Sequence, residues 1–285
     1  MRCFAFLAAL LWSVAAQADM GLMLLGAQSP PHFPLDGLTT PTGCYSTRRL
    51  RAAYVTNKAM NVVRASDSAT MDIGFLADGR PDTATLTTFL AATTGKDVTF
   101  YDQCGAFDLT QATDANRPPV VLTALGTYAA MQYTAGTIAL AAAGNVTPAT
   151  GLASFSAVAN RTVGTGACRL ISENGSAGNS LRTAAAGNQW SIAGGSGGTV
   201  AKAATDATWH AASGVVNGAA SFVNVDGVDS SLGTATGSTT AAAPTIVGLA
   251  STTCQVLEAA FWDNYSLTAI ERTYLNNNQH AFWRF

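Results

Sequence analysis

Carboxyl groups are the side chains in this sequence that could perform acid–base chemistry. Hydrolysis by paired carboxyls needs one acid and one base or nucleophile, placed on either side of the bond that breaks. The chain has three glutamates. Glu173 lies in the turn-like stretch SENGS, where we expect a solvated carboxylate, while Glu258 opens a strand-like run and Glu271 lies in a helical one, so we assign both to structure. Asp226 and Asp229 fall in a β-turn, where aspartate is common. We therefore predict no catalytic residues.

Cysteine chemistry is the next candidate. Removal of the first 18 residues leaves four cysteines, Cys44, Cys104, Cys168 and Cys254, and an even number in an exported chain is typical of disulfides. Three pairings exist, of which Cys44–Cys104 and Cys168–Cys254 are the natural ones if neighbouring segments stay close. We further expect Cys168 and Cys254 on neighbouring strands. The alternative is four buried free thiols.

Metal and nucleotide sites have little support in the sequence. No Cys-x-x-Cys occurs, and the three histidines, His32, His210 and His280, are far apart, which argues against a zinc site. The glycine run at 194–198 lies between two strand-like runs, whereas a phosphate-binding loop joins a strand to a helix. We predict no metal and no cofactor.

Composition narrows the class of protein. Only 11% of residues are charged, against about 25% in an ordinary globular chain, and Ala, Gly, Thr and Ser are abundant. Such a surface is typical of exported or virion-borne proteins. The net charge is −2 and the isoelectric point about 5.8, so nucleic acid is not an expected partner. The basic cluster of Arg48, Arg49 and Arg51 is too small to change this.

Three segments are expected along the chain. Residues 1–18 combine Arg2, an apolar run and a small-residue site at 16–18, which is the layout of a secretory signal peptide; alternatively, they form an apolar arm that packs within an assembly. A start at Met20 is a third option. Residues 19–43 contain several prolines and predict an extended linker or arm, and residues 44–285 predict one domain. The protein is then located in a virion or secreted.

Apolar periodicity predicts the elements that would position any site. We expect a short helix from Tyr45, a helix over Asp82–Ala91 with Asp82 as N-cap, and a last helix over Ser266–Leu275 capped by Ser266. Short runs of alternating or β-branched residues predict strands at 59–64, 71–76, 97–102, 153–158, 169–172, 189–192, 209–216, 221–225, 245–249 and 255–262. This pattern predicts an all-β sandwich with a few short helices.

Two C-terminal stretches carry a family resemblance. In Thr208–Val228, a Trp-His strand is followed by an Asn-Gly turn and a strand ending in Val-Asp-Gly; Glu258–Asn278 has a strand, a capping serine and a short helix. Both resemble concanavalin-A-like and laminin-G-like jelly rolls, which implies that fold here.

The N-terminal part resembles the α-L-arabinofuranosidase B catalytic domain and the phage proteins that share this module. The stretches YSTRRLRAAY, VVRASDSATMDIGF and VTFYDQCG carry the likeness. Cys104, Ala106 and Phe107 depart from it, because the family has a serine and then a polar Asn-Gly-Asn turn there. The region that holds the family's catalytic carboxylates is compressed in this chain, so the resemblance implies scaffold without catalysis.

These observations predict a non-enzymatic structural or surface-adhesion protein, such as a phage head or tail appendage. Its partners would be further copies of itself, other virion subunits, or a cell-surface glycan. For the glycan, Trp190 and Trp209 would stack on a sugar ring, and Asn224 or Asp226 would bind its hydroxyls; the competing interpretation makes Trp209 a core residue and Trp190 a half-buried strand residue. The alternatives are a secreted glycoside hydrolase of the arabinofuranosidase type and a secreted carbohydrate-binding module.

Overall fold

The computed structural model describes residues 33–134, 136, 138–146, 151–163, 166–173, 178–183, 188–195, 197–237 and 243–285. The predicted leader or apolar arm, and residues 19–32 of the predicted linker, lie outside this range. The described residues belong to the compact unit Phe33–Phe285.

Strands make up most of the fold. In chain order they are β1 (Gly43–Ser46), β2 (Met60–Arg64), β3 (Thr70–Ile73), β4 (Gly95–Phe100), β5 (Leu109–Thr110), β6 (Pro119–Leu125), β7 (Tyr128–Tyr133), β8 (Ala139–Val146), β9 (Ala153–Val163), β10 (Cys168–Ser172), β11 (Ser180–Thr183), β12 (Gln189–Ala193), β13 (Thr199–Ala203), β14 (Trp209–Val216), β15 (Gly218–Val225), β16 (Val228–Asp229), β17 (Gly233–Ala235), β18 (Ala243–Ala250) and β19 (Thr253–Asp263). The helices are α2 (Thr83–Leu90), α3 (Ala269–Trp283) and the 3-10 turn η1 (Asp114–Asn116).

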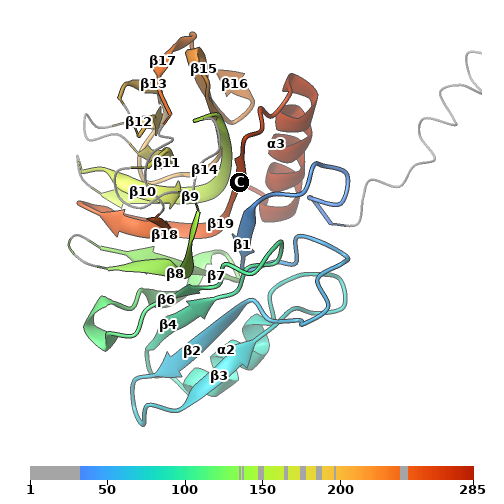
Figure 1. The fold of residues 1–285 in the computed structure, drawn as a ribbon. Helices are drawn as coiled ribbons and strands as arrows, with labels where there is room; N and C mark the ends of the chain where they lie inside the picture. The colour runs from blue at the N-terminus through green and yellow to red at the C-terminus, as the bar shows by residue number, and fades with distance from the viewer. Residues whose placement is uncertain are drawn as a thin grey trace, which may run out of the picture. The chain divides into compact units, whose positions relative to one another are not determined.

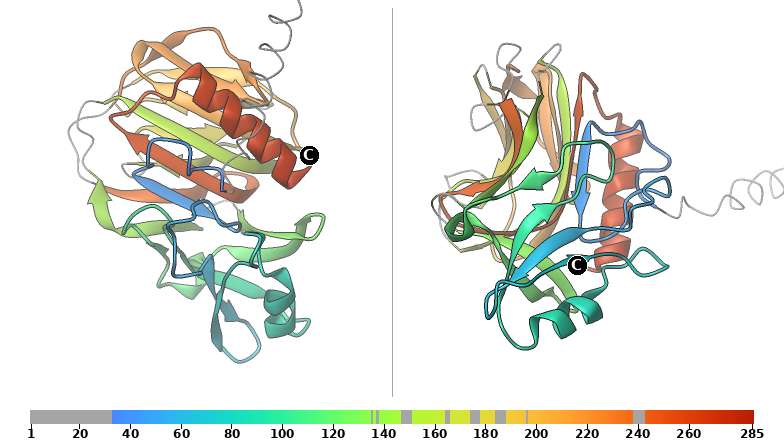
Figure 2. Two further views of the ribbon diagram at one scale, coloured as in Figure 1. Left: turned by 90° about the vertical axis from the view of Figure 1, so that its right-hand side faces the viewer. Right: turned by 60° about the horizontal axis from the view of Figure 1, so that its bottom comes forward.

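The strands form two layers. One runs β16–β15–β14–β9–β19 and continues to β1 and β7, and the other runs β13–β12–β11–β10–β18–β8–β5. β4 joins them, because it pairs with β5 as well as with β2 and β6. Figure 1 and the right-hand view of Figure 2 show the layers stacked, with α3 on the outer side of the first. The predicted all-β sandwich with few helices is confirmed.

A disulfide joins the two layers through the core. Cys168 of β10 and Cys254 of β19 are both fully buried, with their Cα atoms 6.4 Å apart. The pairing is the one expected from proximity in the sequence. The two strands are not neighbours, however, because β10 pairs with β11 and β18 while β19 pairs with β1, β7 and β9. The expectation of neighbouring strands was wrong because sequence patterns do not assign strands to layers.

The strands β14 and β15 and the Asp-Gly turn after β15 agree with the strands and the Val-Asp-Gly end that the sequence predicted. Ala212 lies opposite Val225 in the ladder, and the turn that follows β15 places Asp226 at φ 51° and Gly227 at φ 83°. Two consecutive residues in the left-handed region suit Asp-Gly, because glycine adopts positive φ without steric cost and aspartate tolerates it.

The last helix begins later and extends further than predicted. Its N-cap is Thr268 rather than Ser266: the Thr268 side chain accepts from the backbone of Glu271, and the Glu271 carboxylate accepts from the backbone of Thr268. This reciprocal capping box satisfies two free N–H groups, so it outcompetes the earlier serine. Within the described residues, no helix has both the length and the apolar character to span a membrane.

The predicted helix after Tyr45 is absent from the structure. This stretch forms β1 and then a turn whose backbone is held by Gln103: the side-chain amide donates to the carbonyls of Ser46 and Arg48 and its oxygen accepts from the Leu50 N–H. These long-range bonds replace the i to i−4 bonds of a helix. Arg48 points inward and its Nε donates to Glu258 at 2.7 Å, with both side chains buried.

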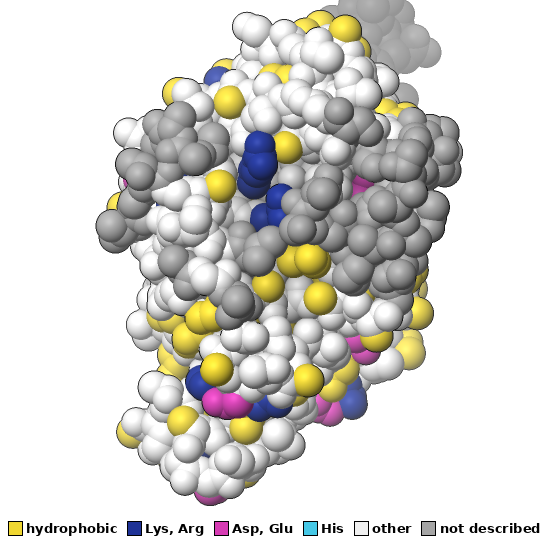
Figure 3. All heavy atoms as spheres, turned by 60° about the vertical axis from the view of Figure 1, so that its left-hand side comes forward, with side chains coloured by type: hydrophobic (Ala, Val, Ile, Leu, Met, Phe, Trp, Pro, Cys, Tyr) yellow, Lys and Arg dark blue, Asp and Glu magenta, His cyan; other side chains and the backbone are white. Residues whose placement is uncertain are grey.

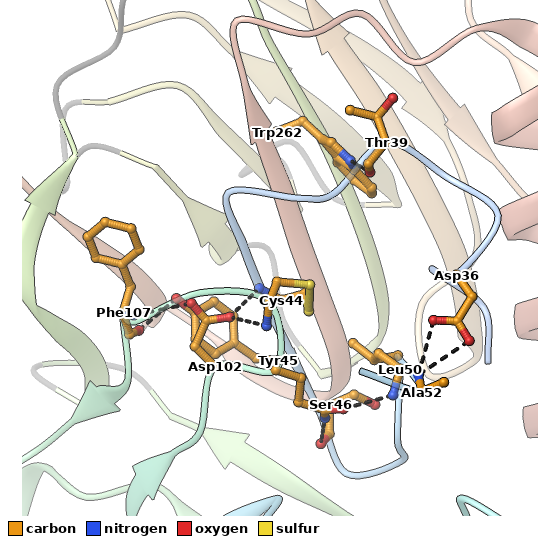
Figure 4. The surroundings of a disulfide bond; sticks show 12 residues. Asp36, Thr39, Cys44, Tyr45, Ser46, Leu50, Ala52, Asp102, Phe107 and Trp262 are labelled. Carbon is orange, nitrogen blue, oxygen red and sulfur yellow. Dashed lines mark hydrogen bonds between the residues drawn. A yellow bond between two sulfur atoms is a disulfide. The ribbon is translucent and has the colours of Figure 1, made fainter. Parts of the chain in front are cut away.

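Residues before the predicted boundary at 44 pack against the domain. Phe33 and Leu35 are buried, and the indole of Trp262 donates to the Thr39 carbonyl at 2.7 Å. The disulfide Cys44–Cys104, with Cα atoms 5.4 Å apart, lies beside this segment (Figure 4). Described residues of the predicted linker are therefore packed rather than extended, because apolar Phe33 and Leu35 bury surface against the domain.

Candidate functional site

Glu173 is buried at the end of β10, contrary to the expected solvated turn. Its side chain is 0% exposed. The Glu173 N–H donates to the Asn179 carbonyl at 3.2 Å, and the Asn179 side-chain amide donates to Oε1 of Glu173. These two bonds close the connection between β10 and β11 and hold the carboxyl in place. Its other oxygen, Oε2, is buried and has no hydrogen-bond partner among the described residues. A stretch whose sequence is polar thus carries a carboxyl that is shielded from water.

Burial changes the charge state of this carboxyl. Desolvation raises the pKa of Glu173 to about 8; the Asn179 hydrogen bond opposes the rise and the negative charge of Asp263 adds to it. At neutral pH the group therefore holds its proton. A carboxylic acid that stays protonated near pH 7 can donate that proton to a leaving oxygen, which an ordinary solvated glutamate cannot.

Asp263 is the second carboxyl at this end of the sandwich. In β19, Phe261 packs in the core between the layers and Trp262 packs in the outer cluster. Because side chains alternate along a strand, Asp263 faces the same side as Phe261, toward Glu173. Its backbone N–H donates to the Thr42 hydroxyl at 3.0 Å. Its negative charge contributes to the raised pKa of Glu173, so the two carboxyls are close enough to influence each other.

A hollow of about 320 Å³ opens on the outer face of the second layer, and Glu173 is not among the residues that line it. Small residues of three strands, Ser180 of β11, Ala193 of β12 and Thr199 of β13, lie opposite one another in its floor. Gly195 also lines it, and its N–H donates to the Asn179 side chain at 2.9 Å. Asn179 thus contacts both the buried acid and a residue of the hollow.

Two arginines stand in the same hollow. Arg169 of β10 and Arg182 of β11 lie directly opposite each other in the ladder. Desolvation and the charge of Arg182 lower the pKa of Arg169 to about 10, and desolvation lowers that of Arg182. Both remain charged at neutral pH.

The predicted sugar-stacking tryptophans do not line an open surface together. Trp190 is 0% exposed and packs edge-on against the His210 ring, 5.4 Å between centroids. Trp190 is a core residue, because it lies on the inward face of β12, which the other layer covers. It is therefore neither the expected sugar platform nor the half-buried strand residue of the competing interpretation. Trp209 is half-buried, and its indole donates to the Ala124 carbonyl at 3.2 Å.

The predicted polar partners of the sugar serve the turn after β15. The Asn224 side chain donates to Asp229 at 2.6 Å and accepts from the Gly227 N–H at 3.0 Å. Asp226 contacts His210 Nδ1 at 2.5 Å and accepts from the Ala211 N–H at 3.0 Å. Desolvation raises the pKa of Asp226, but the hydrogen bond and charge of His210, the Ala211 N–H and the charge of His280 together lower it. The contacts made by these groups are internal to the fold.

The other chemical candidates are accounted for within the fold. Glu258 accepts from Arg48 and from the Gln279 amide, which fastens α3 to β19. Cys44, Asp102 and Cys104 lie together, but the two sulfurs are bonded to each other and offer no thiolate. As Figure 4 shows, Asp102 instead accepts backbone N–H groups.

Solved structures with this fold include arabinofuranosidases. A GH54 α-L-arabinofuranosidase soaked with a cyclic sulfate inhibitor matches with a TM-score of 0.59 at 18% identity, over 84% of this chain and 62% of that one. A glutamate-to-glutamine variant of a GH54 enzyme, soaked with 4-nitrophenyl α-L-arabinofuranoside, matches with 0.59 at 16%, with the same coverage. An arabinofuranosidase complexed with arabinofuranosyl-α-1,2-xylobiose matches with 0.53 at 19%, over 83% and 62%. The chain therefore spans less than two thirds of these enzymes. No family model and no curated protein matches it.

These comparisons correct one prediction and support another. The resemblance to an arabinofuranosidase fits, whereas the phage structural type stays a prediction. The comparisons contradict the prediction that the chain is not an enzyme, because arabinofuranosidases, which are glycoside hydrolases, share its fold at 16–19% identity. That prediction depended on treating Glu173 as a solvated turn residue, and the structure places it in the interior.

Proposed function

We propose that this domain is a glycoside hydrolase of the arabinofuranosidase type, in which Glu173 is the general acid. The observation that carries the proposal is the buried carboxyl of Glu173, whose pKa of about 8 keeps it protonated at neutral pH. The shared fold with arabinofuranosidases supports the choice of substrate class.

The chemistry would use two carboxyls in different roles. Glu173 would donate its proton to the glycosidic oxygen as the bond to the sugar breaks. Asp263 would act as the carboxylate on the other side, either attacking the anomeric carbon or removing a proton from the attacking water. Water then supplies the new hydroxyl, and the proton it releases restores the acid.

The hollow is connected to the acid through one side chain. Glu173 does not line the hollow, but Asn179 donates to Glu173 and accepts from the N–H of Gly195, which does line it. Because the Glu173 carboxyl faces the interior and the hollow lies on the outer face, the hollow would hold a part of the substrate near the acid rather than the bond that breaks.

The test compares two substrates that differ in their need for acid catalysis. Nitrophenolate leaves readily without a proton, whereas a sugar hydroxyl does not. We expect the full chain to hydrolyse both 4-nitrophenyl α-L-arabinofuranoside and arabinofuranosyl-α-1,2-xylobiose. In Glu173→Gln, we expect kcat on the oligosaccharide to fall by about 10²–10⁴, with a smaller loss on the nitrophenyl substrate.

The matched control is Glu271→Gln, which makes the same chemical change in the capping box of α3 and should leave both rates unchanged. Absence of hydrolysis of both substrates by the wild-type chain would overturn the proposed function. Equal losses on both substrates in Glu173→Gln would overturn the role of general acid.

A further inference from the structure

The hollow on the outer face of β10–β13 contains positive charge without a described acidic partner. Arg182 donates from Nη2 to the Thr199 hydroxyl at 3.0 Å, and no ion pair of Arg169 or Arg182 occurs among the described residues. The undescribed internal segments contain no aspartate or glutamate, so they have no carboxylate to offer. Figure 3, which views this side of the molecule, shows basic side chains gathered within the face.

Like charges in opposite ladder positions are unfavourable. Directly opposed residues of antiparallel strands have Cβ atoms about 5 Å apart, and here both guanidinium groups are also partly withdrawn from water, as the lowered pKa values of Arg169 and Arg182 reflect. An anion placed between the two groups would relieve this repulsion.

Two buried polar atoms in the hollow have no hydrogen-bond partner among the described residues. One is the hydroxyl of Ser180, whose side chain is 0% exposed, and the other is the buried Nε atom of Arg169. Buried polar groups are nearly always hydrogen-bonded, so such atoms call for a ligand or water. Both residues line the hollow, where they can serve a common ligand.

We propose that this hollow binds the anionic group of an acidic sugar, held by Arg169 and Arg182 with Ser180 and Thr199 as hydroxyl contacts. The planar fork of a guanidinium group matches a carboxylate with two parallel hydrogen bonds. The volume of about 320 Å³ lies at the lower end of the range for small-molecule sites, and the floor of Ser180 and Ala193 leaves room for a ring. The choice of a sugar as carrier rests on the proposed function; the anion site itself does not.

Calorimetric titration of the full chain tests this without requiring turnover. The probes are glucuronate, glucose, acetate and inorganic phosphate at low salt, where charge pairs are least screened. We expect glucuronate to bind more tightly than each of the others. Affinity for acetate or phosphate equal to that for glucuronate would overturn the acidic sugar, and no binding of any anion would overturn the site.

Variants assign the binding to the two arginines. We expect Arg182→Gln and Arg169→Gln each to weaken glucuronate binding by about tenfold or more, and Arg182→Lys to weaken it as well, because lysine keeps the charge but loses the fork. Lys202→Gln is the matched control: it removes one charge from β13, and Lys202 pairs with the buried Trp190, so it lies on the opposite face. Equal affinity of Arg182→Gln and Lys202→Gln would overturn the proposal.

This inference and the proposed function can fail separately. Hydrolysis of the neutral nitrophenyl arabinofuranoside does not need an anion site, and binding of glucuronate does not need Glu173 to transfer a proton. Glucuronate binding without hydrolysis would overturn only the proposed function, and hydrolysis without glucuronate binding only the anion site.

Discussion

Glu173 makes stability depend on pH in a direction opposite to that of most carboxylates. The group holds its proton up to about pH 8 in the folded state but loses it near pH 4.5 when unfolded. Between these values the folded state binds more protons than the unfolded state, so the free energy of unfolding falls as pH rises. One pKa unit corresponds to about 1.4 kcal/mol, and the contribution lost between pH 4 and pH 7 is therefore about 3 kcal/mol.

Replacement by glutamine removes this titration while preserving the shape of the side chain. We expect Glu173→Gln to gain stability relative to wild type as pH rises, by about 3 kcal/mol between pH 4 and pH 7. Urea unfolding of both proteins at half-unit pH intervals, with disulfides kept oxidised, measures the difference. If the variant also loses activity, the carboxyl of Glu173 lowers the free energy of unfolding near neutral pH but is needed for function. Such a conflict between stability and function is common.

Glu271→Gln serves as the control in the same measurement. Desolvation opposes ionisation of Glu271, but hydrogen bonds from Thr268 and Tyr265 prevail and lower its pKa. Its stabilising contribution is present above the unfolded pKa and lost as pH falls, so its difference from wild type should be flat from pH 5 to pH 8. A Glu173→Gln difference that is equally flat over this range would refute the buried, protonated acid.

Two further predictions concern groups outside the site. Asp97 is completely buried, and desolvation, opposed by a backbone hydrogen bond from Thr99, raises its pKa well above the usual value. Asp97→Asn should therefore raise the urea midpoint at pH 8 more than at pH 5, and a larger gain at pH 5 would contradict this. Glu258→Ala should lower the free energy of unfolding by about 3–5 kcal/mol, because it leaves the Arg48 charge buried without its carboxylate. Asp67→Ala is the control for Glu258→Ala: it removes the partner of the more exposed Arg64 and should change the free energy of unfolding little. Equal losses in the two variants would refute a large contribution from the buried ion pair.

Local sequence patterns predicted much of the sandwich. The strand over Trp209–Val216 was predicted with its observed bounds, and the helix after Asp82 has that residue as its N-cap. In both cases the signal is local: a β-rich run before an Asn-Gly turn, and a capping side chain before an apolar stripe. The helix predicted after Tyr45 failed because Gln103, more than fifty residues away, binds its backbone.

The candidate site could not be predicted in the same way. Glu173 lies in a stretch whose composition indicates a solvated turn, and its burial depends on Asn179 and on the layer that carries Asp263. Arg169 and Arg182 are thirteen positions apart in two short strands, and only the register of β10 with β11 sets them opposite each other. Register depends on strand pairing as well as residue type, so neither arginine stood out in the sequence.

The hairpin of β10 and β11 links the acid to the hollow. It carries Glu173 and Asn179 at its connection and Arg169 and Arg182 along its strands. Cys168, next to Arg169, fixes the start of β10 to β19, the strand that ends in Asp263. One short hairpin thus sets the spacing between a buried acid and a pair of basic side chains, and a covalent bond ties it to the strand that bears the second carboxyl. An acidic sugar held by the arginines would therefore be placed at a defined distance from Glu173, because functional groups on paired strands are positioned more rigidly than groups on loops.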